Sequence, residues 1–354
     1  MPFLLCIWLE ARIQPLYQLL IMASFASIDI LPSKARTLLV WFAFFCGASF
    51  SFAEPVDADL MVLDKQTGLW YYDVQRKPFT GDAASYYASG KKKFRSSYLE
   101  GKRIGQLEGW FEDGTYRAKE TYKDGKKDGL AEAWFSNGQL KSTAVYKLGA
   151  LEGKATEWHE NGKTRIQAVF KGGKPADTLT HWHSNGKLAK EVKFGAPGIE
   201  DGPTTHWYPD GAKMSAAIYR KGKVQGIVTE WFADGKKKSI TPFKDGKQHG
   251  KAIEWHSNGQ KKTEASYAGG LAHGEQLAWH QNGKQHAIAI YIEGKINGTV
   301  KEWNDKGVLI YEAQWKNSKL DGSFVKWDAN GTIIMRKKFV EGEEVKLDAE
   351  KKAP

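Results

Sequence analysis

The chain has 354 residues, of which 52 are Lys or Arg and 41 are Asp or Glu, so its net charge at pH 7 is +11. Its two cysteines, Cys6 and Cys46, lie near the N-terminus, and the rest of the chain offers neither a disulfide nor thiol chemistry. The basic charge favours acidic proteins, lipid headgroups or envelope polymers over nucleic acid as partners, although solubility of a long sheet explains the same charge.

The N-terminal segment predicts a secretory signal peptide. An apolar run, 38–53, follows two basic residues and ends in a small-residue pattern at Ser51 and Ala53. We expect a helix here and cleavage after Ala53, which would place the mature protein in the periplasm or outside the cell. An uncleaved membrane anchor is the alternative, although the run is shorter than the ~20 residues of a spanning helix. Met22 is a possible true start of the chain.

A single pattern repeats from residue 86 to about residue 342. Aligned on an aromatic anchor, eleven copies follow one another at 24 residues, with one interval of 25. A glycine follows each anchor by four residues and a second aromatic follows it by twelve, while another glycine precedes each anchor by five, except at Asp177. The first anchor is Tyr86, and the other ten are Trp110, Trp134, Trp158, Trp182, Trp207, Trp231, Trp255, Trp279, Trp303 and Trp327. A fixed period of this length predicts a repeat protein.

Each copy predicts a β-hairpin. In the copy EWHSNGQKKTEASYAGG, two alternating segments flank Asn-Gly. A three-residue loop with a left-handed glycine pairs Trp255 with Lys261. This register places Trp255 and Tyr267 on one face, together with the small residue two positions before Tyr267, and sets Glu254 opposite Lys262 on the other. We therefore expect one aromatic face and one face of ion pairs.

Neighbouring hairpins must share apolar surface, because an isolated hairpin is marginal in water. Placed side by side, they stack the anchors into one row and the second aromatics into another, and each ring buries ~150–250 Å². The sequence predicts an all-β fold, an elongated single-layer antiparallel sheet of about eleven hairpins, with almost no helix beyond the signal segment. The expected parts are a signal region at 1–53, a mature lead at 54–68, the repeat array at 69–342 and a charged tail at 343–354, with 68–81 capping the first hairpin.

The repeated unit resembles a known family. The pattern E-W-x-x-N-G-K-x-K, followed by Y-x-x-G-K-x-x-G and preceded by KPFTG at 77–81, resembles the MORN (membrane occupation and recognition nexus) repeat variants of bacterial YwqK-type antitoxin-like proteins. The resemblance covers about 69–342 and implies a twisted or curved sheet that acts as a scaffold or binding surface. Other members are linked to membranes and partner proteins. An antitoxin-like role is implied by the resemblance alone, and the signal peptide argues against toxin neutralisation in the cytoplasm.

The copies depart from the family pattern at three places. Asp177 replaces a glycine, the stretch FGAPGIEDG carries the extra residue before Trp207, and Ser318 stands where the glycine between two units is expected.

The sequence shows no catalytic or metal-binding motif. It lacks a Gly-x-Ser-x-Gly elbow, a phosphate loop and His-Glu-x-x-His, and its carboxylates recur at positions typical of cross-strand ion pairs. His159 and His183 occupy equivalent positions, as do His256 and His280. Equivalent residues of adjacent hairpins are ~9–10 Å apart, whereas zinc ligands lie ~2 Å from the ion. We predict no catalytic residue, no metal site and no cofactor.

These features predict a non-enzymatic, exported repeat scaffold that binds another protein at the cell envelope. The ten tryptophans from Trp110 to Trp327 are the candidate binding residues, although their main expected role is to form the core. One alternative is a glycan or cell-wall binding module that stacks sugars on the aromatic row. The other is peripheral attachment to an anionic membrane through lysines such as 91–93 and 236–238.

Overall fold

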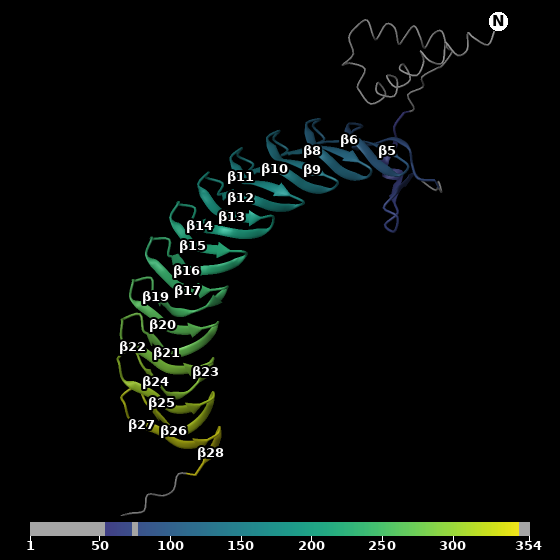
Figure 1. The fold of residues 1–354 in the computed structure, drawn as a ribbon. Helices are drawn as coiled ribbons and strands as arrows, with labels where there is room; N and C mark the ends of the chain where they lie inside the picture. The colour runs from purple at the N-terminus through teal and green to yellow at the C-terminus, as the bar shows by residue number, and fades with distance from the viewer. Residues whose placement is uncertain (1–53, 73–76, 347–354) are drawn as a thin grey trace, which may run out of the picture. The chain divides into compact units, whose positions relative to one another are not determined.

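The computed structural model describes residues 54–72 and 77–346, and these residues are almost entirely β-structure. Their one helical element is a 3-10 turn, η2 (Ala58–Leu60), and none of them forms a helix able to cross a membrane. Twenty-six strands belong to one sheet, and β2 and β3 form a separate pair. The predicted all-β repeat sheet is thus confirmed, while the signal segment 1–53 lies outside the described residues (Figure 1).

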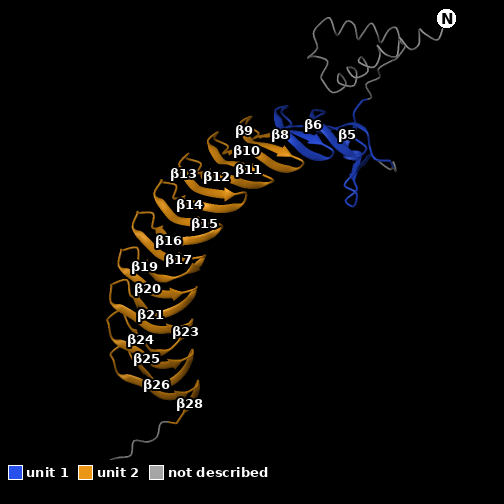
Figure 2. Ribbon diagram, viewed as in Figure 1, with its two compact units in different colours: residues 1–129 blue, residues 130–354 orange. Residues whose placement is uncertain are grey.

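The chain divides into two compact units, 1–129 and 130–354 (Figure 2). The strands that begin in the first unit are β1 Val56–Asp57, β2 Met61–Leu63, β3 Trp70–Tyr72, β4 Gly81–Tyr86, β5 Lys92–Leu99, β6 Lys102–Trp110, β7 Tyr116–Lys123 and β8 Lys126–Trp134.

The first unit opens with a small aromatic core against its first hairpin, β4–β5. The parallel pairing of Val56 in β1 with Ala83 in β4 brings the lead segment onto this hairpin. Phe79, Ala83 and Tyr98 are buried there, with the rings of Phe79 and Tyr98 5.8 Å apart, and Trp70 packs against them. The segment before the first hairpin therefore forms a cap, as the sequence predicts.

The second unit is a succession of hairpins in a single curved layer (Figure 2). Its strands are β9 Leu140–Lys147, β10 Ala150–Trp158, β11 Thr164–Lys171, β12 Lys174–Trp182, β13 Leu188–Ala196, β14 Ile199–Trp207, β15 Lys213–Arg220, β16 Lys223–Trp231, β17 Lys237–Lys244, β18 Lys247–Gln248, β19 Gly250–Trp255, β20 Lys261–Ala268, β21 Leu271–Trp279, β22 Gln285–Ile292, β23 Lys295–Ile296, β24 Gly298–Trp303, β25 Leu309–Lys316, β26 Lys319–Trp327, β27 Ile333–Val340 and β28 Glu343–Val345. Each long strand pairs antiparallel with the next in sequence, as β19 does with β20 and β20 with β21. Three residues assigned to the charged tail, 343–345, form β28.

The hairpin loop has the predicted three-residue form. The His256 N–H donates to the carbonyl oxygen of Gln260 at 2.8 Å, and the Gly259 N–H donates to that of His256 at 2.9 Å. Gly259 has a φ of 88°, a left-handed conformation that glycine adopts without a steric penalty. Trp255 then pairs with Lys261, which confirms the register at the loop.

A β-bulge follows this loop and changes which residues share a face. The residue opposite Glu254 is Thr263, so Lys262 is an extra residue in the second strand. Both Glu254 and Lys262 turn to the same side, and their charged groups lie 3.4 Å apart. The predicted ion pair is therefore present, but it forms at a bulge.

The expected common face for both aromatic rows is wrong because of this bulge. An extra residue reverses the alternation of side chains beyond it, so Tyr267 pairs with Gly250, while Trp255 lies on the opposite face. The same register shift occurs in the eight hairpins whose first strand ends at an anchor from Trp158 to Trp327. We call the face with these anchors the tryptophan face. The face with the second aromatics and the small residue two positions before each is the small-residue face.

The small-residue face holds the most buried side chains of the second unit. Ala168 is 2% exposed, Val192 1% and Ala313 0%, whereas every anchor tryptophan is only partly buried. On this face Phe324 contacts Tyr311 and Phe339 at ring distances of 5.5 and 5.7 Å. The small-residue face therefore contributes apolar burial to the array that the anchors alone do not provide.

The anchors form a row on the tryptophan face without stacking on one another. Equivalent residues of adjacent hairpins are two strands apart, ~9–10 Å, which exceeds the 4.5–7 Å of ring contacts. Other side chains occupy the interval, as Lys261 does with its Nζ 5.6 Å from the ring centre of Trp279. The structure therefore corrects the expectation that stacked anchors form the core.

Candidate binding surface

The candidate tryptophans stand at one end of each hairpin, because every anchor is the last residue of its strand. In the second unit the strand register places the anchors from Trp158 to Trp327 on one face. Trp110 of the first unit also ends a strand and pairs with Tyr116, with 5.7 Å between ring centres. The sequence thus predicted correctly that these rings form a row. It predicted wrongly that the second aromatics lie on the same face.

In two neighbouring hairpins, the residues of the tryptophan face that lie between the two ends of the strands are all uncharged. In β14 and β15 its central residues are Pro203, Thr205, Ala216 and Ile218, and in β16 and β17 they are Ile227, Thr229, Ile240 and Pro242. We call these eight residues, together with Trp207 and Trp231, the uncharged patch. Ile218 is 45% exposed and Ile227 58% exposed. Exposed apolar surface of this kind is typical of interaction sites.

Charged side chains bound the uncharged patch on both sides. In the following hairpin Glu264 accepts from Lys251 at 2.5 Å and from Lys261 at 2.7 Å on the same face. In the preceding hairpin Glu191 and Lys193 occupy this face. The patch is therefore a local feature of two hairpins and not a property of every repeat.

The predicted cross-strand ion pairs lie on the small-residue face. Glu157 pairs with Arg165, and Glu230 lies 3.4 Å from Lys238. The four side chains are 41–53% exposed, and pairs this exposed contribute ~0–1 kcal/mol each. These ion pairs therefore contribute little to the stability of the fold.

The histidines that follow the anchors join one hairpin to the next. Nε2 of His159 lies 2.9 Å from the carbonyl oxygen of Trp182, and Nε2 of His280 lies 2.7 Å from that of Trp303. In other copies a tyrosine makes the same contact, as when the hydroxyl of Tyr208 donates to a backbone oxygen at 2.9 Å. Among the described residues no group of three or more His, Cys, Asp or Glu could hold a metal ion. These histidines have a structural role that sequence reasoning missed.

The turn asparagines form a second ladder. Nδ2 of Asn258 donates to the carbonyl oxygen of Gln281 in the next turn at 2.7 Å, while its Oδ1 accepts the N–H of Gln260 at 3.0 Å. Asn161, Asn185 and Asn282 repeat both contacts. Their recurrence at one position was the available signal, but sequence reasoning treated Asn-Gly only as a turn former.

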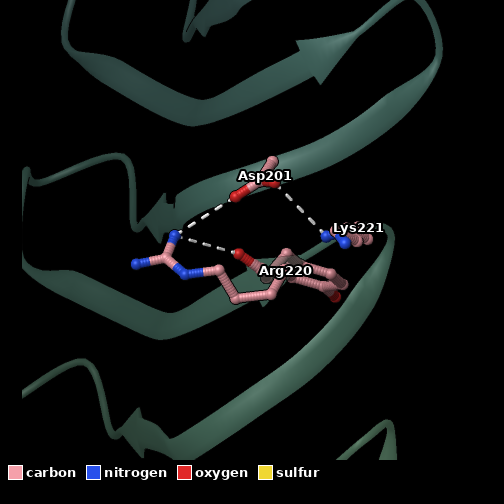
Figure 3. Close-up of polar contacts among 4 residues, drawn as sticks. Asp201, Arg220 and Lys221 are labelled. Atoms are coloured by element: carbon pink, nitrogen blue, oxygen red, sulfur yellow. Dashed lines mark hydrogen bonds and ion pairs between the residues drawn. The ribbon is translucent and has the colours of Figure 1, made fainter.

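A polar residue six positions before the anchor accepts a backbone N–H from the turn that joins one hairpin to the next, at the end of the unit opposite the Asn-Gly loop. Oδ2 of Asp201 accepts the N–H of Lys221 at 3.4 Å, and Oδ1 accepts Nη1 of Arg220 at 3.2 Å (Figure 3). Lys221 has a positive φ of 50° in the two-residue turn between hairpins. Glu152 and Asn297 accept the equivalent N–H in their units. The signal in the sequence is a polar residue at this position in every copy except those with Ile104 and Ala176.

Two histidines on the small-residue face have lowered pKa values. Lys190 pairs with His181 on one side and with His206 on the other. Partial burial lowers the pKa of each imidazole, and the positive charge of Lys190 lowers it further. Nδ1 of His206 also lies 3.1 Å from the hydroxyl of Ser215. This cluster opposes protonation of both rings.

The chain matches the family model of the MORN repeat variant at 127–148, 151–171, 224–245, 248–268 and 296–317, and each match covers one hairpin. No curated protein matches the chain. Among solved structures, a TcdB2–TccC3–Cdc42 complex shares 10% identity over 72% of this chain and 18% of that one, with a TM-score of 0.16. The Photorhabdus luminescens Tc holotoxin pore shares 10% identity over 78% of this chain and 16% of that one, with a TM-score of 0.18.

The chain thus spans less than a fifth of those solved chains, and likenesses this weak carry no argument about fold or function. Repeats of the matched family generally mediate protein or membrane interactions, and they are typically non-catalytic. Five hairpins of this chain are thus MORN-variant repeats.

Proposed function

We propose that this protein is a non-enzymatic scaffold that binds another protein through the tryptophan face, at the uncharged patch. The observation that supports it is the pair Ile218 and Ile227, both exposed between Trp207 and Trp231. Tryptophans beside exposed apolar side chains suit the desolvated centre of a protein interface.

The chemistry of the patch favours an apolar protein segment as the partner. A sugar needs polar groups beside the stacking ring, and the centre of the patch offers only the hydroxyls of Thr205 and Thr229. Lys213 and Lys237 pair with the two tryptophans at the hairpin ends, where acidic residues at the rim of a partner would find complementary charge.

We further propose that this binding takes place outside the cytoplasm, at the cell envelope. The support is the apolar run 38–53 with its small-residue end at Ala53. Sequencing the N-terminus of the protein from its host tests the export. We expect a mature chain that begins at Glu54, and an intact leader on a cytoplasmic chain would contradict it.

Crosslinking in the native host tests the binding surface. A photoreactive amino acid at Ile227 should crosslink one reproducible protein, and the same group at Glu254, on the other face, should not. The variant Ile218→Asp/Ile227→Asp should lose this partner, because a charge in the patch cannot be desolvated without cost. A matched control is Val145→Asp/Val169→Asp, which alters two exposed valines at 41% and 43% exposure outside the patch.

Three results would contradict the proposal. Crosslinks to polysaccharide would favour the glycan alternative, and salt-sensitive binding to anionic vesicles without any protein crosslink would favour the membrane alternative. Equal loss of the partner in the patch variant and the valine variant would show that the patch has no special role.

A further inference from the structure

Three basic side chains lie next to one another on the small-residue face. Lys190 of β13 pairs with His181 of β12 on one side and with His206 of β14 on the other. Side chains paired in this way have Cβ atoms ~4.5–5.5 Å apart, so the three lie in a row about 10 Å long. All three are partly buried. We call them the basic row.

The basic row reverses the charge that other copies of the repeat carry at the same place. The residue directly before the anchor, where the two histidines stand, is a glutamate in four other copies, Glu157, Glu230, Glu254 and Glu302. The residues that pair with Glu230 and Glu254 in their own hairpins are Ser239 and Thr263, which are neutral. In β12 to β14 imidazoles replace the carboxylate and a lysine replaces the hydroxyl. This part of the face therefore attracts anions where the equivalent parts attract cations.

The acids on either side do not neutralise the basic row. Glu157 forms its ion pair with Arg165, a further cation whose charge lowers the pKa of His181. On the other side, the carboxylate of Glu200 raises the pKa of His206, but less than burial and Lys190 together lower it. Within the part of the chain that the structure describes, Lys190 has no carboxylate partner. The row thus keeps a positive charge that nothing described here balances.

The basic row carries hydrogen-bond donors as well as charge. Nδ1 of His206 lies 3.1 Å from the hydroxyl of Ser215. With that hydroxyl donating to Nδ1, the neutral ring holds its proton on Nε2, and the protonated ring donates from Nε2 as well. Lys190 adds an ammonium group with three donors. The next pair on this face, Val192 and Thr204, is only 1% and 5% exposed, and buried surroundings strengthen hydrogen bonds to a charged ligand.

We propose that the basic row, Lys190 with His181 and His206, is a second binding site and takes a phosphate group. A phosphate monoester carries a charge of about −1.5 to −2 near neutral pH and presents three acceptor oxygens, one for each side chain of the row. A carboxylate has one charge and two oxygens in a plane, and it would leave one of the three side chains without a partner. The site lies on the face opposite the uncharged patch, so the two ligands do not compete for the same surface.

Titration of the full chain with inorganic phosphate, followed by NMR of the histidine rings, tests this site. The signals of His181 and His206 should move, whereas those of His256, whose Nε2 already contacts the backbone of Trp279, should stay. Bound phosphate should raise the pKa of both rings by about one unit, because a nearby negative charge favours the protonated form. Glycerol phosphate should act in the same way, and chloride at equal ionic strength should not. A response to inorganic phosphate alone would identify the free ion, and not an esterified phosphate, as the ligand.

Variants of the lysine show whether the row itself binds the phosphate. Lys190→Gln should weaken binding about tenfold, and Lys190→Arg should retain it, because the arginine keeps a cationic donor. The matched control is Lys326→Gln, which changes a lysine of the same face that pairs with Tyr311 and Met335 and has no basic neighbour there. It should leave binding unchanged. If Lys190→Gln does not fold, the titration of the wild type and of Lys190→Arg still decides the matter.

Three results would overturn the proposal. Signals of His181 and His206 that do not move with phosphate, or that move equally with chloride, would show that the rings respond to ionic strength at most. Equal weakening by Lys190→Gln and Lys326→Gln would show a general effect of net charge. A shift at His256 as large as those in the row would place the phosphate elsewhere. None of these results depends on whether the uncharged patch binds its partner.

Discussion

Nε2 of His256 lies 2.9 Å from the carbonyl oxygen of Trp279, one hairpin further along the chain. The contact begins at the residue after one anchor and ends on the backbone of the next anchor. Because the acceptor is a carbonyl, the imidazole must donate from Nε2, which fixes its orientation beside the turn. Cohesion between hairpins therefore depends on the corners of the units as well as on their apolar surfaces.

Replacement of His256 by alanine should destabilise the array by ~0.5–1.5 kcal/mol, because the carbonyl oxygen of Trp279 loses its side-chain donor. Replacement by tyrosine should restore most of the loss, since the hydroxyl of Tyr208 makes the same contact with the backbone of Trp231. The midpoint of urea unfolding measures both effects. An alanine variant as stable as the tyrosine variant would show that the contact contributes nothing.

The period and the turn residues were enough to predict the fold. They also predicted the pairing of Trp255 with Lys261 at the hairpin loop. The bulge at Lys262 could not be predicted, because two adjacent lysines fit either face and give no signal for an extra residue. Ala265 and Tyr267 alternate regularly after it, so the pattern fits both possible faces. The face of a strand beyond a bulge is decided by pairing, which a single sequence does not contain.

The candidate surface was predictable only in part. The anchors were evident from their spacing, but the uncharged patch depends on Ile218 and Ile227 sharing a face with Trp207 and Trp231, which follows from the bulges.

Replacement of Asp177 by glycine should stabilise the protein by about 1 kcal/mol. Asp177 has a φ of 85°, which is strained for a residue with a side chain, and the other ten copies have glycine at this position. The matched control is Thr178→Gly, the next residue of the same strand, which should destabilise by ~0.5–1 kcal/mol. The urea midpoints of the two variants should therefore move in opposite directions. A lower midpoint for Asp177→Gly would mean that the carboxylate makes a stabilising contact larger than the strain.

Loss of the side chain of Asp201 should destabilise the turn that contains Lys221. The variant Asp201→Ala removes the acceptor for the N–H of Lys221 and should cost about 1 kcal/mol. Asp201→Asn should be close to the wild type, because Asn297 accepts the equivalent N–H in its own unit. Hydrogen exchange at Lys221 is the direct measurement, and it should speed up only in the alanine variant.

A control at the same turn separates the backbone strain at Lys221 from the hydrogen bond between its N–H and Asp201. Lys221→Gly keeps the N–H and removes the side chain from a residue with a φ of 50°, so it should raise the stability. If Asp201→Ala and Asp201→Asn lose stability equally, the contact of Asp201 with Arg220, and not the cap, is what holds this corner.

Acidification should destabilise the region around His181 and His206. Burial, followed by the charge of Lys190, lowers the pKa of both rings in the folded state, and Arg165 adds to this at His181. The unfolded chain binds these protons as pH falls below about 6.5, whereas the folded chain resists them until a lower pH. Stability should therefore be full above that pH and should fall as the pH drops from about 6.5 towards the folded-state pKa values.

The urea midpoint measured at about pH 7.5 and about pH 5.5 checks this sign. The variant His181→Gln/His206→Gln should lose less stability between the two pH values than the wild type, because it removes two groups that bind protons more weakly in the folded chain than in the unfolded chain. Lys190→Gln should act in the same direction through the pKa values alone, since both rings lose their cationic neighbour on β13. The His256→Tyr variant is the control and should retain the acid sensitivity that His181 and His206 cause. A histidine double variant as acid-sensitive as the wild type would assign the effect to groups elsewhere in the chain.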